Sequence, residues 1–211
     1  MTYSMADWSD PGTTVITGVD VVAFYLGGWT PHVWTQTQIN AQSVHWMMPI
    51  WVYNPNTPGG TQGVTDGKAI VSALHTLGVS TGVRVAIDME SSIDEPYIAG
   101  VRNVIGPAGY HVMIYGGPST VFQNWPQNQN GPGGGWWVAD WLGHPFLYNH
   151  PGVWATQWTN PLNPPPWDQS VVADLSYLWW HKPVTFSFSA KAKDTVNGKT
   201  ASKSSSFVVA S

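Results

Sequence analysis

This sequence contains few charged residues and no cysteine. Only 9% of the 211 residues are charged and no cysteine is present, whereas charged residues make up roughly 25% of an average soluble protein. The absence of cysteine excludes a disulfide framework and thiolate metal sites. Eight basic residues against twelve acidic ones give a net charge of −4. No basic surface is therefore available to neutralise phosphates, and we expect no nucleic-acid partner.

Long apolar runs are also missing. No uncharged stretch approaches the roughly 18 apolar residues of a membrane span, so no membrane partner is expected. Residues 1–8 have neither the basic region nor the apolar stretch of a signal peptide, so the sequence does not predict secretion by the usual route. Hydrophobic residues nevertheless make up 43% of the chain, with fourteen Trp. This composition excludes extensive disorder and predicts one domain with a substantial core.

The first half of the chain alternates between strand and helix patterns. Two amphipathic patterns predict helices at residues 66–77 and 93–105, and Ser92 and Glu95 have the spacing of a capping box before the second helix. Nearly continuous apolar runs are typical of strands covered on both faces, as in a parallel sheet wrapped by helices. They occur at residues 18–26, 47–53, 83–89 and 110–115.

After residue 116 the helical patterns fade. Further strands are predicted at residues 136–141, 153–158 and 171–175, joined by loops rich in Gly, Pro and Asn. These loops leave no room for full crossover helices. We therefore predict an α/β fold, a small TIM-like (β/α) barrel with helix-poor last strands, followed by a C-terminal tail.

The composition changes at Lys182. Five of the eight basic residues lie in residues 182–211, among Ser, Thr and Ala. We expect a barrel domain over residues 1–181 and a separate segment over residues 182–211. That segment is either a flexible tail or an arm docked on a neighbouring molecule. Alternating stretches on both sides of Asn197-Gly198 favour a hairpin.

Acidic residues interrupt or end the predicted strands at five positions: Asp20, Asp88, Glu90, Asp140 and Asp174. A buried carboxylate is unfavourable unless it is paired or functional, and the carboxyl ends of barrel strands converge on one mouth. Asp88 and Glu90 share one face of a strand, about 6.6 Å apart along it. Such a pair suits glycoside hydrolysis, which needs one protonated and one ionised carboxyl. The alternative is a strand-end carboxylate that caps the following helix.

Aromatic side chains lie at or near the ends of the same strands, and they are Tyr25, Trp51, Tyr53, Tyr115, Trp141 and Trp158. Sugar rings stack their C–H faces on aromatic rings, so an acidic mouth lined by Trp and Tyr suits a glycan. The alternative is that these rings fill a core with little Leu and Ile. The seven His have no ligand spacing, so no metal is expected. No phosphate-binding loop or nucleophile elbow is present, and no cofactor is expected.

Six short motifs resemble, in their order, the lysozyme-type muramidases of glycoside hydrolase family 25. They are more similar still to the related glycoside-hydrolase-like domains of unknown function found in actinobacteria and their phages. The resemblance spans about residues 15–180 and implies a small, flattened barrel with peptidoglycan as the substrate class. The motifs are Gly18-Val19-Asp20, Asp88-Met89-Glu90, Tyr115-Gly116, Trp137-Val138-Ala139-Asp140-Trp141, Ala155-Thr156-Gln157-Trp158 and Ala173-Asp174-Leu175-Ser176.

The resemblance implies roles for particular residues. Glu90 would be the general acid, and Asp88 its partner that stabilises charge or positions the reacting group. Asp20 and Asp174 would be supporting carboxylates of the same site. The expected substrate-binding residues are Tyr53, Tyr115, Trp141, Gln157 and Trp158. Only about 31 residues separate Asp20 from Trp51, which indicates that one early βα unit is missing or merged. The barrel is therefore expected to be incomplete or rearranged.

Two functions remain open at this level. The first is a peptidoglycan-directed, muramidase-like glycoside hydrolase that acts on bacterial cell-wall glycan. The second is a catalytically inactive glycan-binding or structural module of a phage virion, a tail or capsid accessory protein whose C-terminal segment binds other virion proteins. The chain is accordingly expected in a phage virion or at the bacterial cell-wall surface.

Overall fold

The computed structural model describes most of the chain. It covers residues 1–9, 12, 14–123, 134–159 and 167–181, together with the backbone of two strands at residues 185–193 and 200–208.

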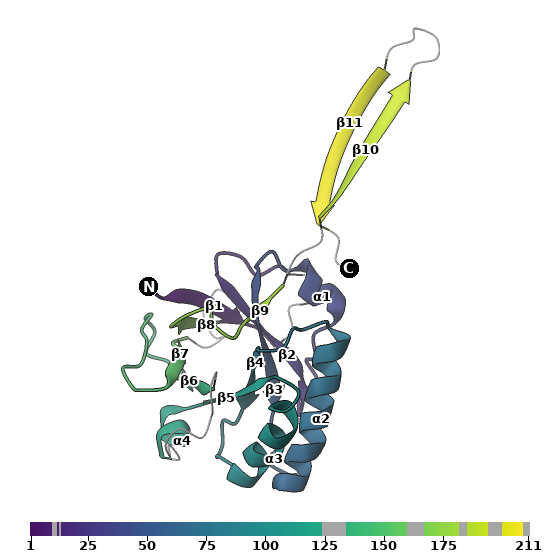
Figure 1. The fold of residues 1–211 in the computed structure, drawn as a ribbon. Coiled ribbons are helices and arrows are strands. Elements are labelled where there is room, and N and C mark those ends of the chain that lie inside the picture. The colour runs from purple at the N-terminus through teal and green to yellow at the C-terminus, as the bar shows by residue number, and fades with distance from the viewer. Residues whose placement is uncertain are drawn as a thin grey trace.

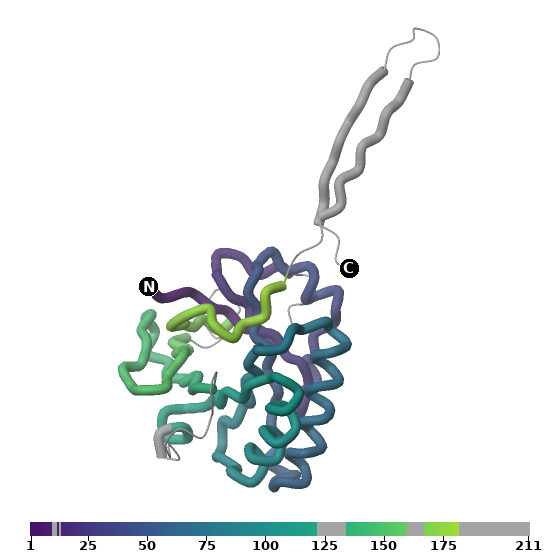
Figure 2. Tube along the Cα trace, viewed as in Figure 1, coloured from purple at the N-terminus to yellow at the C-terminus, as the bar shows by residue number. Residues whose placement is uncertain are grey.

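Eight strands close a barrel (Figure 1). The first seven run parallel to one another, and the eighth is antiparallel to both of its neighbours, the seventh and the first. In Figure 2 the purple N-terminal strand lies beside the yellow-green segment that contains the eighth strand, far away in sequence. The strands are β1 (Tyr3–Asp7), β2 (Val21–Gly28), β3 (Trp46–Val52), β4 (Arg84–Asp88), β5 (His111–Gly116), β6 (Gly135–Ala139), β7 (Val153–Gln157) and β8 (Asp168–Val172).

Helices cover only part of the barrel wall. The described residues form four helices: α1 (Gln36–Ala41), α2 (Gly60–Thr76), α3 (Glu95–Ile105) and α4 (Pro118–Gln123). The two longest, α2 and α3, pack on each other, and α2 also contacts β2 while α3 contacts β5 (Figure 1). A Cβ at Gly63 would collide with the carbonyl oxygen of Tyr97, and one at Gly100 with that of Gly60. Glycine at these positions therefore allows the close approach of the two helices.

Side chains alternate between two apolar clusters. One lies between the barrel and the helices and includes Phe24, Ile70 and Leu74. The other fills the barrel interior and includes Met5, Met113 and Trp137. Successive residues of a strand point to opposite faces. On β1, every second side chain therefore shares the interior face with Met5. The interior is a packed core, and its carboxylates lie at the strand ends.

The predicted TIM-like α/β barrel with helix-poor last strands is confirmed. The sequence did not reveal β1, and this strand completes a barrel that was expected to lack a unit. The strand predicted at residues 171–175 is β8 and begins at Asp168. The capping box expected at Ser92 and Glu95 is wrong, because the N-cap of α3 is Asp94, whose side chain accepts from the Tyr97 N–H.

Three further strands follow or flank the barrel. The two-residue strand β9 (Trp179–Trp180) pairs antiparallel with the start of β3. Strands β10 (Thr185–Lys193) and β11 (Thr200–Val208) form a separate antiparallel pair. The turn expected at Asn197-Gly198 lies outside the described residues, and the domain division at residue 181 stays a prediction. Within the described part of the chain, no helix has the length and apolar character needed to cross a membrane.

Candidate active site

Four carboxylates gather at the mouth of the barrel, at the carboxyl end of its parallel strands. Asp7 ends β1, Asp88 ends β4, and Glu90 follows two residues later. Asp168 begins β8, and because this strand runs antiparallel, its first residue lies opposite Asp7 in the register. Cα atoms paired in this way are about 4.5–5.5 Å apart, and their side chains share one face. We call these four residues the acid cluster.

Burial and neighbouring carboxylates raise the pKa of three members of the acid cluster. Burial raises the pKa of Asp7 well above its usual value, and the charges of Asp168, Asp88 and Glu90 raise it further. Burial, followed by the charge of Glu90, raises the pKa of Asp88 to about 7. The pKa of Asp168 is raised to about 6, mainly by burial. Asp7, Asp88 and Asp168 therefore stay protonated to a higher pH than isolated Asp side chains do.

Glu90 is the exposed member of the acid cluster. It lies on the bend after β4, where the Met89 N–H donates to the Tyr115 carbonyl oxygen over 2.9 Å. The Thr120 hydroxyl donates to the carbonyl oxygen of Glu90 over 3.2 Å. Glu90 is thus the solvent-exposed member of the cluster, beside the half-buried Asp88.

Tyr115 and Gln157 connect the acid cluster by hydrogen bonds. The Tyr115 hydroxyl donates to Gln157 Oε1 over 2.6 Å, and Gln157 Nε2 donates to the Thr159 carbonyl oxygen over 3.1 Å. Gln157 also hydrogen-bonds Asp168, which lowers the pKa of that carboxyl against the effect of burial. Burial and the nearby carboxylates raise the pKa of Tyr25 and of Tyr115. Both phenols stay protonated and can donate hydrogen bonds at the mouth.

Trp137 forms the floor below these groups. Its ring meets that of Tyr115 edge-on, with centroids 4.8 Å apart. Its indole Nε1–H donates to Ser170 Oγ over 3.0 Å, across the barrel interior. The polar groups of the mouth therefore rest on a packed layer, which fixes their positions.

Asp20 and Asp174, predicted as supporting carboxylates, are not brought to the acid cluster. Asp20 Oδ2 accepts from the N–H and the hydroxyl of Ser4, at the start of β1 and about 10 Å of strand away from Asp7. Asp174 follows β8, and its Oδ1 accepts from the Ser176 N–H. Because β8 is antiparallel, its last residues lie at the end opposite the mouth. Asp7 and Asp168, rather than the predicted Asp20 and Asp174, lie beside Asp88 and Glu90.

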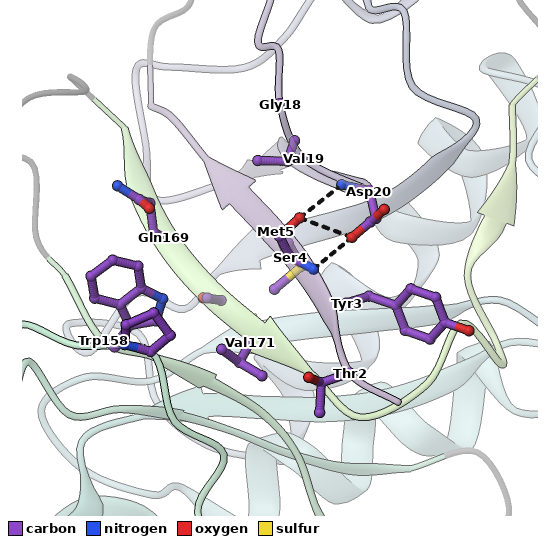
Figure 3. Close-up of a pocket in the computed structure, with 12 residues that line it drawn as sticks. Thr2, Tyr3, Ser4, Met5, Gly18, Val19, Asp20, Trp158, Gln169 and Val171 are labelled. Carbon is purple, nitrogen blue, oxygen red and sulfur yellow. Dashed lines mark hydrogen bonds between the residues drawn. The ribbon is translucent and has the colours of Figure 1, made fainter.

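The predicted substrate-binding residues divide among several places. Tyr115 and Gln157 lie at the acid cluster. Trp141 is 55% exposed and follows β6 at the mouth end of the barrel. The Tyr53 hydroxyl donates to Asp94 Oδ2 over 2.9 Å, so this side chain serves the start of α3. Trp158 lines a pocket on the outer wall of the barrel, together with Asp20 (Figure 3).

Asp7 and Asp168 were missed, although the sequence contains a signal for each. Residues 3–7 place Tyr3, Met5 and Asp7 on one face of a short strand, and Asp168 begins an alternating stretch that ends at Val172. Within the described part of the chain, no group of His, Asp and Glu is arranged to hold a metal ion.

Comparisons with known proteins identify a family and related folds. Residues 16–174 match the family described as Rv2525c-like, glycoside hydrolase-like domain. The Tat-secreted protein Rv2525c of Mycobacterium tuberculosis, in complex with L-tartrate, superposes with a TM-score of 0.65 at 14% identity, covering 85% of this chain and 99% of that one. No match was found among the curated proteins.

Two further solved structures share the fold. The modular autolysin LytC of Streptococcus pneumoniae, in complex with a synthetic peptidoglycan ligand, gives a TM-score of 0.60 at 15% identity, over 81% of this chain and 46% of that one. A family 25 glycosyl hydrolase from Bacillus anthracis gives 0.51 at 13% identity, over 81% and 88%. At these identities the likeness shows the fold alone.

Proposed function

Since this chain belongs to the Rv2525c-like, glycoside hydrolase-like domain family, we propose that it is a muramidase-like glycoside hydrolase of bacterial cell-wall glycan. The resemblance predicted from the sequence motifs is confirmed by that match, and the fold is related to family 25 hydrolases and to an autolysin. The activity itself is proposed from the acid cluster.

The observation that carries the proposal is the pairing of exposed Glu90 with half-buried Asp88. Glycoside hydrolysis needs a proton donor for the leaving oxygen and a second carboxyl that stabilises or attacks the sugar. Burial and the charge of Glu90 raise the pKa of Asp88 to about 7, so Asp88 gains and loses its proton near neutral pH. In the proposed reaction Glu90, the general acid that the resemblance implies, donates to the glycosidic oxygen, while Asp88 positions the reacting group and stabilises charge.

The remaining groups of the mouth suit a saccharide. The phenol of Tyr25 stays protonated and can donate to a sugar oxygen, while the Tyr115 hydroxyl already donates to Gln157. Trp141 presents an exposed ring at the same end of the barrel. The autolysin LytC, whose barrel superposes on this one, binds a synthetic peptidoglycan ligand, and this supports peptidoglycan as the substrate class and the cell-wall surface as the place of action. The alternative, an inactive virion module, draws no support from these relatives.

Release of reducing sugar ends from purified peptidoglycan tests the proposal. We expect Glu90→Gln to lower the rate by about 10²–10⁴-fold, the usual contribution of a general acid. Asp174→Asn is the matched control, because it removes a carboxylate at the opposite end of the barrel and keeps an oxygen for the Ser176 N–H. Circular dichroism confirms equal folding of the three proteins.

Two results would contradict the proposal. One is a Glu90→Gln protein that is as active as the parent. The other is a parent protein that binds peptidoglycan without releasing reducing ends, which would make this chain a binding module.

A further inference from the structure

A second recess lies on the outer wall of the barrel, between β1 and β8 (Figure 3). Its volume is about 430 Å³. Trp158, Gln169 and Val171 line one side, and Tyr3, Ser4 and Asp20 line the other. We call this the wall recess. None of these six residues belongs to the acid cluster.

The wall recess exists because of how β8 alternates and how the barrel is covered. Asp168 and Ser170 point to the interior, so Gln169 and Val171 point outward. The long helices α2 and α3 pack over β2 and β5, away from β1 and β8 (Figure 1). Neither of these two helices covers the outer face of β1 and β8 at the recess.

Hydrogen bonds fix the backbone at Trp158 and the carboxylate of Asp20 in the lining of the wall recess. The Trp158 N–H donates to the Gln169 carbonyl oxygen over 2.9 Å. The Asp20 carboxylate is fixed through Oδ2 by the N–H and hydroxyl of Ser4, over 2.8 and 2.9 Å. Figure 3 shows the indole of Trp158 and the carboxylate of Asp20 on opposite sides of the recess. The aromatic ring of Trp158 thus lies across the recess from hydrogen-bonding groups.

This chemistry selects a class of ligand. An indole offers a surface on which the C–H face of a sugar ring stacks, while carboxylate and amide groups bind its hydroxyls. The twelve lining residues contain Asp20 and no Lys, Arg or His, which disfavours a phosphate or a carboxylate. Polar groups around the recess also disfavour a purely apolar ligand.

We propose that the wall recess is a second saccharide-binding site, which takes an uncharged hexose or N-acetylhexosamine unit of a glycan. This deepens the proposed function, because it assumes that the chain meets glycan, but it does not require hydrolysis. Gln157 and Asp168 face the mouth, and their chain neighbours Trp158 and Gln169 face the recess. A polymer held there is kept near the mouth, which raises its effective concentration at the acid cluster.

Fluorine NMR of the full chain labelled with 5-fluorotryptophan tests this assignment, with chitotetraose as the uncharged probe. The Glu90→Gln protein is used so that the probe is not consumed. The signal that disappears in Trp158→Phe is that of Trp158, and Trp137 and Trp180 are assigned in the same way. Trp137 reports the mouth through its contact with Tyr115. Trp180, 44% exposed at β9, is the control for nonspecific effects.

We expect the Trp158 signal to shift saturably while the Trp180 signal stays in place. Gln169→Ala should weaken the affinity read at Trp158 by about 2- to 10-fold, the value of one hydrogen bond, without changing the affinity read at Trp137. A Trp158 signal that does not move while the Trp137 signal does would overturn the wall recess and leave the proposed function intact. A Trp158 signal that shifts while the Trp137 signal does not would support the recess and count against the mouth as a glycan site. N-acetylglucosamine 6-phosphate should not shift the Trp158 signal, and a shift equal to that from chitotetraose would overturn the assignment to an uncharged sugar.

Discussion

Asp7 is the most deeply enclosed carboxylate of the acid cluster, with 5% of its surface exposed. Its Oδ1 has no hydrogen-bond partner among the described residues. An ionised group in this position is desolvated and faces three other carboxylates, so the folded protein favours its protonated form. The acid cluster therefore lowers the free energy of unfolding at high pH. Functional sites often contain groups with shifted pKa values that lower stability in this way.

We expect the free energy of unfolding to rise as the pH is lowered from about 8 to about 5. The folded pKa of Asp88 is about 7 and that of Asp168 about 6, and that of Asp7 is also raised; an unfolded Asp has a pKa of about 3.9. The folded state thus binds more protons in this interval. The contribution is fully present below the unfolded pKa and is lost as the pH rises through the folded pKa values.

Thermal melts followed by circular dichroism at constant ionic strength measure this dependence. Asp7→Asn removes one of the interacting carboxyls, so its midpoint should vary less with pH than that of the parent. A parent protein that melts at a higher temperature at alkaline pH than at mildly acidic pH would contradict the prediction.

Gln157 is a positioning residue of the mouth, because it accepts from Tyr115 and hydrogen-bonds Asp168. Gln157→Leu should lower the free energy of unfolding by about 1–3 kcal/mol, since the Tyr115 hydroxyl is left buried without its acceptor. It should also raise the pKa of Asp168, so the pH profile of hydrolysis should shift upward. Urea unfolding and a pH profile of reducing-end release are the measurements.

The Tyr115→Phe, Gln157→Leu double variant provides the control. Removing both partners of one hydrogen bond should change stability by less than the sum of the single changes. Strict additivity would show that the bond between Tyr115 and Gln157 does not contribute to stability.

At the scale of elements, the contact between α2 and α3 depends on small residues. Gly63→Ala places a methyl group against the Tyr97 carbonyl oxygen, so the two helices must separate or shift. We expect a loss of about 1–3 kcal/mol in the free energy of unfolding, as for other overpacked interiors. Urea unfolding measures the loss. Thr65→Ala, at an exposed position of the same helix, should stay within about 0.5 kcal/mol, and an equal loss in both variants would refute the packing argument.

The strands differ in how well their sequences predicted them. Apolar runs identified β2, β3, β4 and β5 because both faces of these strands are covered. Strand β1 has only five residues with a partly polar pattern, and such a short alternation is not distinctive. It becomes a strand because β2 and β8 lie on its two sides and supply partners for its backbone.

At the scale of the whole molecule, barrel closure and the segment after residue 181 are separate questions. A chain that ends at His181 retains the closed barrel and β9. We expect its melting midpoint to match that of the full chain, because β10 and β11 pair with each other and, within the described residues, with no strand of the barrel. Circular dichroism melts of the two chains test this, with reducing-end release as a second readout. A large drop in the midpoint would show that residues 182–211 belong to the barrel domain.

The sequence by itself determined the class of fold and half of the acid cluster. Buried parallel strands have continuous apolar runs, helices have a 3.6-residue period, and Asp88 and Glu90 are neighbours in the chain. Local patterns carry all of this. The sequence also placed Tyr115 and Gln157 among the site residues through the motifs of the resemblance.

Only the tertiary structure decided which other carboxylates join Asp88 and Glu90. In a wholly parallel barrel every strand presents its last residue at the mouth, and that assumption favoured Asp174. Strand β8 runs the other way, so its first residue, Asp168, meets Asp7 while Asp174 lies at the far end. Strand direction is set by pairing between segments distant in sequence. No local sequence pattern indicates the direction of β8, and this direction decides which two carboxylates complete the acid cluster.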